Sequence, residues 1–274
     1  MENLLKRYRD HLCENEKSTS TIEKYVRDAE RFIEFLDGRE IGRSVVLQYK
    51  SFLCANYKRA GANSMLCALN SLLSFMEKGE YCVKLFKIQR KLFCSEETEL
   101  SRSEYKRLAN AAKEKGNERL CLIIQTICTT GMRISELEYI TVEAALCGEA
   151  TVCCKGKTRS IFLVSDLCQR LLDYAKRNGI TDGCIFITRN KKPVDRSNVW
   201  REMKKLCIKA GVSEKKVFPH NLRHLFARTF YNSEKDIATL SDILGHSSID
   251  TTRIYIISSG KQHREKLEGM DLLL

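Results

Sequence analysis

The 274-residue sequence lacks any uninterrupted apolar run that approaches the roughly 20 residues needed to cross a lipid bilayer. Internal repeats and low-complexity segments are also missing. The opening residues 1–7 do not lead into an apolar stretch with a small-residue cleavage site, so the pattern of a secretory signal is absent. We therefore expect a globular cytoplasmic protein without a membrane segment, long enough for two domains that each bury a core.

Cysteine is plentiful, but the spacing typical of zinc-binding and redox-active proteins is missing. The 13 cysteines are scattered along the chain and include no C-x-x-C pair. Cys153 and Cys154 are adjacent, and adjacent side chains on a strand point to opposite faces. The preferred interpretation is therefore buried, reduced thiols that fill space as small hydrophobic groups.

Acidic residues are outnumbered by basic ones along the whole chain. The formal net charge is +12, from 47 Lys and Arg against 35 Asp and Glu. Residues 1–95 and residues 96–274 each carry an excess of basic side chains. Such an excess is expected if both parts contact the same polyanion, and nucleic acid is the commonest acidic partner of a protein of this kind.

Helical periodicity dominates residues 1–92. A capping box begins at Ser20 and includes Glu23, and apolar residues then recur at helical spacing until Gly38. Two further runs and the segment Leu4–Leu12 complete a predicted four-helix domain that contains no catalytic constellation. The apolar positions of the three runs are Ile22, Val26, Ala29, Ile33, Leu36, Val46, Tyr49, Leu53, Met65, Leu66, Leu69, Leu72, Leu73 and Met76.

Residues 93–100 lose the helical period and concentrate charge, which predicts a linker between two domains. The second domain then covers residues 101–274. Ser101 and Glu104 form another capping box, and the apolar helix that follows is expected to end near Gly131.

Strand-like alternation appears only within the second domain. Residues 151–155 and 158–164 are separated by Gly156-Lys157, which predicts a β-hairpin. A short strand is expected at Cys184–Thr188. The remaining segments are expected to be helices that start at Ser135, run near 166–178, and continue to Tyr255 with breaks at Gly211, Pro219 and Gly245. The fold class is therefore mainly α, with an α+β second domain that contains a small antiparallel sheet.

Four short patterns occur in a fixed order in the second domain. They are Gly131-Met132-Arg133-Ile134-Ser135-Glu136-Leu137, Lys155-Gly156-Lys157, His220-Asn221-Leu222-Arg223-His224, and Leu244-Gly245-His246 followed nine residues later by Tyr255. In this order, after a small helical domain, they resemble the Arg, Lys, His-x-x-Arg, His and Tyr signature of the tyrosine recombinases, the family of phage integrases and Xer proteins. The resemblance implies a SAM-like helical core-binding domain followed by a catalytic domain.

The resemblance also implies a reaction in which Tyr255 attacks a DNA phosphate and forms a transient 3′-phosphotyrosine bond. A phosphodiester is anionic and repels nucleophiles, so fixed cations must stabilise its transition state. Arg133 and Arg223 are candidates for a phosphate clamp, because a guanidinium stays charged and binds two oxygens at once. His246 would add a hydrogen bond, and His220 occupies the family position of the histidine that assists proton transfer from the tyrosine.

Lys155 matches the family position of the general acid that protonates the departing 5′-hydroxyl. In many relatives a glycine precedes this lysine, whereas Cys154 stands here and the turn is one residue shorter. Lys157 therefore remains an alternative. Because tyrosine attack exchanges one phosphoester for another, neither ATP nor a metal nor any other cofactor is expected.

Each of these residues also has a plainer interpretation. Arg133 and Glu136 can form an ordinary surface ion pair, and the lysines of the turn can be hairpin-edge charges. Tyr255 taken alone would be a half-buried anchor. The histidines can be core or capping residues, while a zinc site would need cysteine or carboxylate partners at suitable spacing. The histidines concerned are His220, His224 and His246.

The resemblance further implies a tetramer on two paired double-stranded DNA sites, exchanging strands through a four-way junction. The tail, residues 256–274, is expected to dock on a neighbouring subunit, the alternative being a frayed terminus. Both a mobile-element integrase and a Xer-like resolvase fit. Two other functions stay open: a type IB topoisomerase, which shares the catalytic residue set, and a DNA-binding regulator without catalysis.

Overall fold

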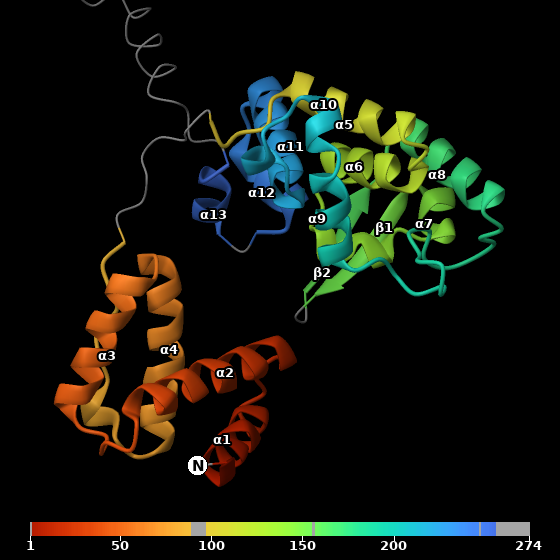
Figure 1. Cartoon of the computed structure of the whole chain (residues 1–274). Helices are drawn as coiled ribbons and strands as arrows, with labels where there is room; N and C mark the ends of the chain where they lie inside the picture. Colours follow the sequence, from red (N-terminus) through yellow and green to blue (C-terminus); the bar gives the residue numbers. More distant parts are fainter. Residues whose placement is uncertain (1, 89–96, 155–156, 247, 256–274) are drawn as a thin grey trace, which may run out of the picture. The chain divides into compact units, whose positions relative to one another are not determined.

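The computed structural model describes residues 2–88, 97–154, 157–246 and 248–255 (Figure 1). The chain divides into two compact units, residues 1–90 and residues 91–274. The described part is mainly helical and has one two-stranded sheet, which confirms the expected fold class. Among its helices, none is both long and apolar enough to cross a membrane.

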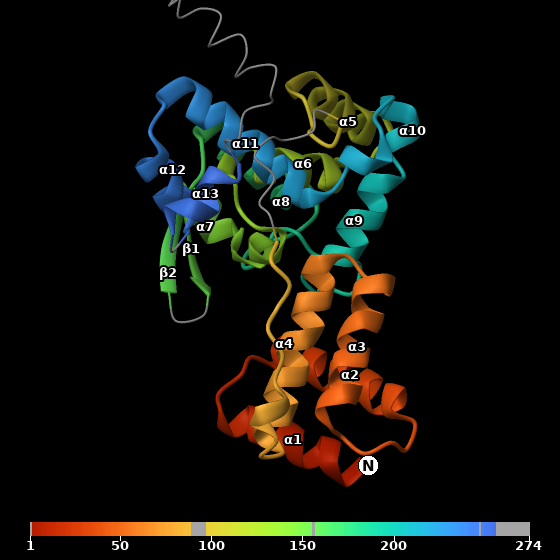
Figure 2. The ribbon, with the colours of Figure 1, turned by 90° about the vertical axis from the view of Figure 1, so that its left-hand side faces the viewer.

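The first unit consists of four α-helices and a short 3₁₀ turn. Helix α4 contacts each of the other three helices (Figure 2). Their core includes Tyr8, Phe32 and Tyr49, all almost completely buried. The elements are α1 (Glu2–Glu14), α2 (Thr19–Leu36), α3 (Arg43–Asn56), α4 (Arg59–Phe75) and η1 (Gly79–Tyr81).

The start of α2 differs from the prediction of a capping box at Ser20. The helix begins at Thr19, and its N-cap residue, Ser18, makes no side-chain hydrogen bond to a backbone amide. The Ser18 hydroxyl instead lies 2.8 Å from the Thr21 hydroxyl. A hydroxyl engaged in this way leaves the helix start without the reciprocal bonds of a capping box.

Two asparagines of α4 hold the extended segment that follows the helix bundle. The Asn70 amide donates to the Val83 carbonyl at 2.9 Å and accepts from the Val83 N–H at 3.0 Å. Asn63 pairs in the same way with the carbonyl and N–H of Phe86, at 2.9 and 2.8 Å. Asn63 and Asn70 are two helical turns apart, about 11 Å, and Val83 and Phe86 are three extended residues apart, about 10 Å. The two asparagines therefore have the same spacing as the two residues that they bind. Residues 83–86 are thereby fixed along α4.

The second unit buries a larger apolar core around α6 (Glu118–Thr130), whose C-cap Gly131 has a positive φ of 66°, as expected for a glycine that ends a helix. The predicted capping box of Ser101 and Glu104 is present at the start of α5 (Arg102–Glu114). The other helices are α7 (Val142–Cys147), α8 (Ser165–Arg177), α9 (Arg196–Lys204), α10 (Cys207–Ala210), α11 (Pro219–Glu234), α12 (Ile237–Leu244) and α13 (Ile249–Arg253), with 3₁₀ turns η2 (Ile134–Tyr139) and η3 (Glu214–Lys216).

Part of the segment predicted as a linker lies against the second unit. The Thr98 carbonyl accepts a hydrogen bond from Asn221 at 2.9 Å, and Leu100 is 1% exposed in the core. Glu99 forms an ion pair with Arg228. Residues 97–100 therefore belong to the second unit, and residues 93–96 lie outside the described residues.

The sheet is the predicted hairpin, formed by β1 (Glu149–Cys154) and β2 (Lys157–Phe162). The strands are antiparallel, and Val152 pairs with Arg159 and Cys154 with Lys157. With Cys154 paired to Lys157, the two strands are joined by residues 155–156. The predicted connection, Gly156-Lys157, was one residue too far toward the C-terminus.

Two sequence-based predictions of local structure in this unit are wrong. Cys184–Thr188 forms no strand but only isolated bridges, one to Thr141 and one from Ile187 to Pro193. Proline has no N–H to extend a ladder, which explains why the pairing stops there. The helix expected to start at Ser135 is the short 3₁₀ turn η2.

The described cysteines are all unpaired, but most of them are not buried. Only Cys121 and Cys207 are buried, whereas Cys13, Cys54 and Cys147 are exposed. Cys153 is also exposed, because strand alternation places it on the face opposite the buried Val152. The expectation of buried, space-filling thiols is therefore wrong for most described cysteines.

Candidate active site

Five of the six residues selected from the sequence lie in the described part of the second unit. Arg133 precedes η2, His220 and Arg223 lie in the first half of α11, His246 follows the C-cap of α12, and Tyr255 follows α13. Lys155 lies outside the described residues. Lys157 lies in β2, and only its backbone position is described.

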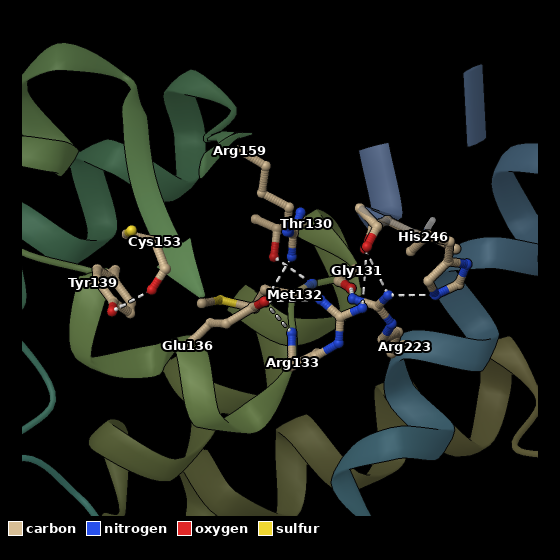
Figure 3. A network of polar contacts seen from close by, with 12 residues as sticks. Thr130, Gly131, Met132, Arg133, Glu136, Tyr139, Cys153, Arg159, Arg223 and His246 are labelled. Atoms are coloured by element: carbon tan, nitrogen blue, oxygen red, sulfur yellow. Dashed lines mark hydrogen bonds and ion pairs between the residues drawn. The ribbon is translucent and has the colours of Figure 1, made fainter. Parts of the chain in front are cut away.

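Arg223 is the most deeply buried charged residue of the site, at 1% exposure. Its Nη1 donates to the Gly131 carbonyl at 2.6 Å, and its Nη2 donates to the Leu244 carbonyl at 2.8 Å. The same Nη2 lies 2.8 Å from Nε2 of His246 (Figure 3). The guanidinium is thus held by the ends of α6 and α12 together with a histidine.

Gly131 must be glycine for this contact to form. Its φ is +66°, and a Cβ at this position would lie 2.3 Å from a ring carbon of Phe226 on α11. The missing side chain allows α11, and with it Arg223, to come close enough for the hydrogen bond to the Gly131 carbonyl.

His246 is neutral in this arrangement. An arginine can only donate hydrogen bonds, so Nε2 of His246 accepts from Arg223 and carries no proton. Nδ1 then carries the proton and donates to the hydroxyl of Thr252, a fully buried residue of α13, at 2.8 Å. Burial lowers the pKa of His246 to about 4, helped by the charges of Arg223 and Arg133.

Arg133 is the accessible member of the arginine pair, with 39% of its side chain exposed. Its Nη1 donates to Glu136 at 3.0 Å, and its Nη2 donates to the Gly245 carbonyl at 3.3 Å. The Glu136 side chain is only 3% exposed and also accepts from Nη2 of Arg159 at 2.6 Å. Arg133 and Glu136 thus form the ion pair of the plainer interpretation, but its carboxylate is buried and shared with Arg159. One carboxylate between two guanidiniums leaves a net positive group that suits an anionic phosphate.

Tyr255 is 6% exposed and lies among the other candidate residues. Its hydroxyl is 3.4 Å from Nε2 of His220. Its ring centroid lies 4.3 Å from that of His224 and 5.4 Å from that of His246, and the guanidinium carbon of Arg223 lies 6.0 Å from the centroid. Tyr255 therefore lies close to three histidines and to Arg223, all within the second unit.

The two histidines of α11 have lowered pKa values. Burial lowers the pKa of His220, and the charges of Arg223 and Arg133 lower it further. Burial lowers the pKa of His224 to about 4, with a contribution from His220. A neutral imidazole can accept a proton, so His220 can serve as a base toward the Tyr255 hydroxyl.

His224 is expected to make folding stability depend on pH. Between its folded pKa of about 4 and its ordinary value of 6.5, the unfolded chain binds a proton that the folded chain does not. The free energy of unfolding therefore falls as the pH drops through this window. Replacement by phenylalanine should reduce the stability loss between pH 7 and pH 5 by about 2 kcal/mol, measured by urea unfolding at both pH values. An unchanged loss would contradict this assignment.

Two residues of the site were missed in the sequence. Arg159 could have been noticed, because strand alternation puts it on the same face as the buried Ile161, where a charge needs a partner. Thr252 could not be selected from the sequence, because its role depends on a hydrogen bond with His246, which precedes α13, whereas Thr252 lies within that helix. In the described part of the chain, no three His, Cys, Asp or Glu side chains gather as a metal site.

Comparison with known proteins places these residues in a family context. The model described as "Phage integrase family" matches residues 98–262. Tyrosine recombinase XerA of Pyrococcus furiosus is 29% identical over 268 residues, which cover 94% of this chain and 90% of the relative. A tyrosine recombinase of Pseudothermotoga lettingae is 28% identical and covers 100% of this chain and 99% of the relative.

The fold is also shared with solved structures. A lambda integrase (75-356) dimer bound to a COC′ core site has a TM-score of 0.74 and 18% identity, covering 95% of this chain and 96% of that one. XerH site-specific recombinase bound to difH substrate has a TM-score of 0.72 and 18% identity, covering 94% and 82%. At these identities the likeness concerns the fold.

Proposed function

This chain belongs to the phage integrase family and is a tyrosine recombinase, and we propose that Tyr255 is the nucleophile with which it cleaves and rejoins DNA at a specific site. The observation that carries this assignment is the position of the Tyr255 hydroxyl, 3.4 Å from His220, with Arg223 and His246 close to the Tyr255 ring. Double-stranded DNA is the substrate in this proposal.

The proposed step transfers one phosphoester bond. The Tyr255 oxygen attacks phosphorus, its proton passes to His220, and the bond from phosphorus to the 5′-oxygen breaks. Arg133 and Arg223 stabilise the charge on the non-bridging oxygens, and a lysine of the hairpin gives a proton to the departing 5′-oxygen. Both ring nitrogens of His246 are engaged, with Arg223 and Thr252, so His246 orients the Arg223 guanidinium instead of adding the expected hydrogen bond to the phosphate. In religation the 5′-hydroxyl attacks the 3′-phosphotyrosine and the tyrosine leaves, so the bond count is unchanged and no external energy source is consumed.

Trapping the covalent intermediate tests the proposed function. The purified chain would be incubated with chelator and nicked duplexes tiled across the DNA flanking its gene, and denaturant-resistant adducts would be sought. A nick lets the short product diffuse away, so religation fails and the adduct accumulates. Tight, salt-sensitive binding without any adduct would favour the catalytically silent DNA-binding regulator.

Lys155→Ala is expected to lower the cleavage rate on an ordinary phosphodiester by about 100-fold or more, because it removes the proposed general acid. A substrate with sulfur at the 5′-bridging position should restore most of the rate, since a thiolate leaves without a proton. Lys157→Ala is the matched control and should cleave both substrates normally. The opposite pattern would move the general acid to Lys157.

The finer biological assignment is also a proposal. A solved lambda integrase tetramer is bound to a Holliday junction, which supports a tetramer on two paired DNA sites here. The tail that would dock on a neighbouring subunit, residues 256–274, lies outside the described residues. The role would be integration or excision of a mobile element or Xer-like resolution, in the cytoplasm. Neither a type IB topoisomerase nor a silent regulator has an observation in its favour.

A further inference from the structure

Arg159 of β2 is a largely buried arginine whose partners belong to other elements. Only 15% of its side chain is exposed. Its Nη2 donates to Glu136 of η2 at 2.6 Å, and its Nη1 donates to the carbonyl of Ile243 near the end of α12 at 2.7 Å. A buried charge needs such partners, so the side chain has a defined place between β2, η2 and α12.

Gly245 leaves the space that the stem of Arg159 occupies. A Cβ on Gly245 would lie 2.3 Å from Cδ and 2.8 Å from Nε of Arg159. The Gly245 carbonyl accepts from Arg133, and the next residue is His246. Arg159 therefore lies against Gly245, the residue that precedes His246. It also bonds Glu136, the carboxylate that pairs with the proposed phosphate-binding Arg133 (Figure 3).

The hairpin has a second tie to η2 on its other strand. The Tyr139 hydroxyl donates to the carbonyl of Cys153 at 3.0 Å. Cys153 lies one residue before the end of β1, and Arg159 lies two residues after the start of β2. Both ties join the described end of the hairpin to η2, and that of Arg159 uses a charged pair and also extends to α12.

We propose that Arg159 is a positioning residue that fixes the hairpin, and with it the lysine of the turn, relative to the phosphate-binding arginines. The inference rests on the proposed function, because the lysine acts there as the general acid. Arg159 does not contact DNA in this proposal. Its bonds to Glu136 and to the Ile243 carbonyl hold β2 against the elements that carry the phosphate-binding arginines. The lysine can then deliver its proton to the 5′-oxygen of a phosphate bound by those arginines.

Cleavage of two substrates tests the positioning role. Arg159→Gln should cleave an ordinary nicked duplex at least about 10-fold more slowly, as expected for a misplaced acid. A 5′-bridging sulfur substrate should recover most of this loss, and Arg159→Lys should lie between the variant and the original chain. A merely structural role would slow both substrates equally, and that result, or an unchanged rate on both, would overturn the proposal.

Limited trypsin digestion gives a readout that needs no activity. Cleavage after Lys155 or Lys157 should be several-fold faster in Arg159→Gln at a temperature where both proteins are folded. Arg177→Gln is the matched control, because Arg177 also pairs with a glutamate, Glu118, but at an exposed position. An unchanged digestion rate at the hairpin would overturn the proposal. A chain that forms no DNA adduct would instead refute the proposed function, while the digestion would still judge the anchoring by Arg159.

Discussion

Replacing Tyr255 with phenylalanine is expected to abolish the covalent DNA adduct and to leave the fold intact. The phenol oxygen is the proposed nucleophile, and phenylalanine has none. The ring would keep its contacts with His224 and His246, because these involve the aromatic carbons. The lost hydrogen bond to His220 is long, at 3.4 Å, so the free energy of unfolding should change by less than about 1 kcal/mol.

The adduct would be measured on a denaturing gel and the stability by urea unfolding. Tyr231→Phe is the matched control, because Tyr231 contacts the same small core cluster as Tyr255 but is not a candidate nucleophile. It should form the adduct at the original rate. An adduct that persists in Tyr255→Phe would mean that another residue attacks the phosphate.

Arg223→Lys is expected to reduce cleavage by about 100- to 1000-fold although the positive charge is kept. A guanidinium spans the carbonyls of Gly131 and Leu244 and the ring of His246 at the same time. An ammonium on a flexible stem cannot satisfy these three acceptors in one plane. At least one buried acceptor would lose its partner, which costs about 1–3 kcal/mol of stability.

Single-turnover cleavage and urea unfolding would separate the two effects. Arg177→Lys is the control, because this arginine has an exposed side chain and a single ion pair with Glu118. At a urea concentration well below its unfolding midpoint, the Arg223→Lys variant is folded, and its single-turnover cleavage should still be slow. A rate within about 10-fold of the original would show that charge alone is sufficient at this position.

The sequence was most informative where function depends on residue type at a fixed spacing. The order of the motifs that contain Arg133, His220, Arg223, His246 and Tyr255, and their resemblance to the tyrosine recombinase signature, sufficed to select these residues. They come together in one unit. Local alternation likewise predicted the hairpin, because the pairing of β1 and β2 is between neighbours in the chain.

Non-local contacts explain what the sequence did not reveal. Arg159 acquires its role from a carbonyl 84 residues away, and no local periodicity encodes that distance. The bridges near Cys184 depend on Thr141 and Pro193, which a propensity for strand formation does not take into account. The exposure of most cysteines was missed for a related reason, since burial is decided by which face of an element meets the core.

The asparagine pairs on α4 shorten the stretch of chain that joins the two units. Because Asn63 holds Phe86, and Asn221 holds Thr98, only residues 87–97 connect these two anchored points. If both units bind DNA, attachment of one keeps the other at an effective concentration in the millimolar range. In that case we expect the intact chain to bind its site about 100- to 10,000-fold more tightly than either unit alone, without any additional contact.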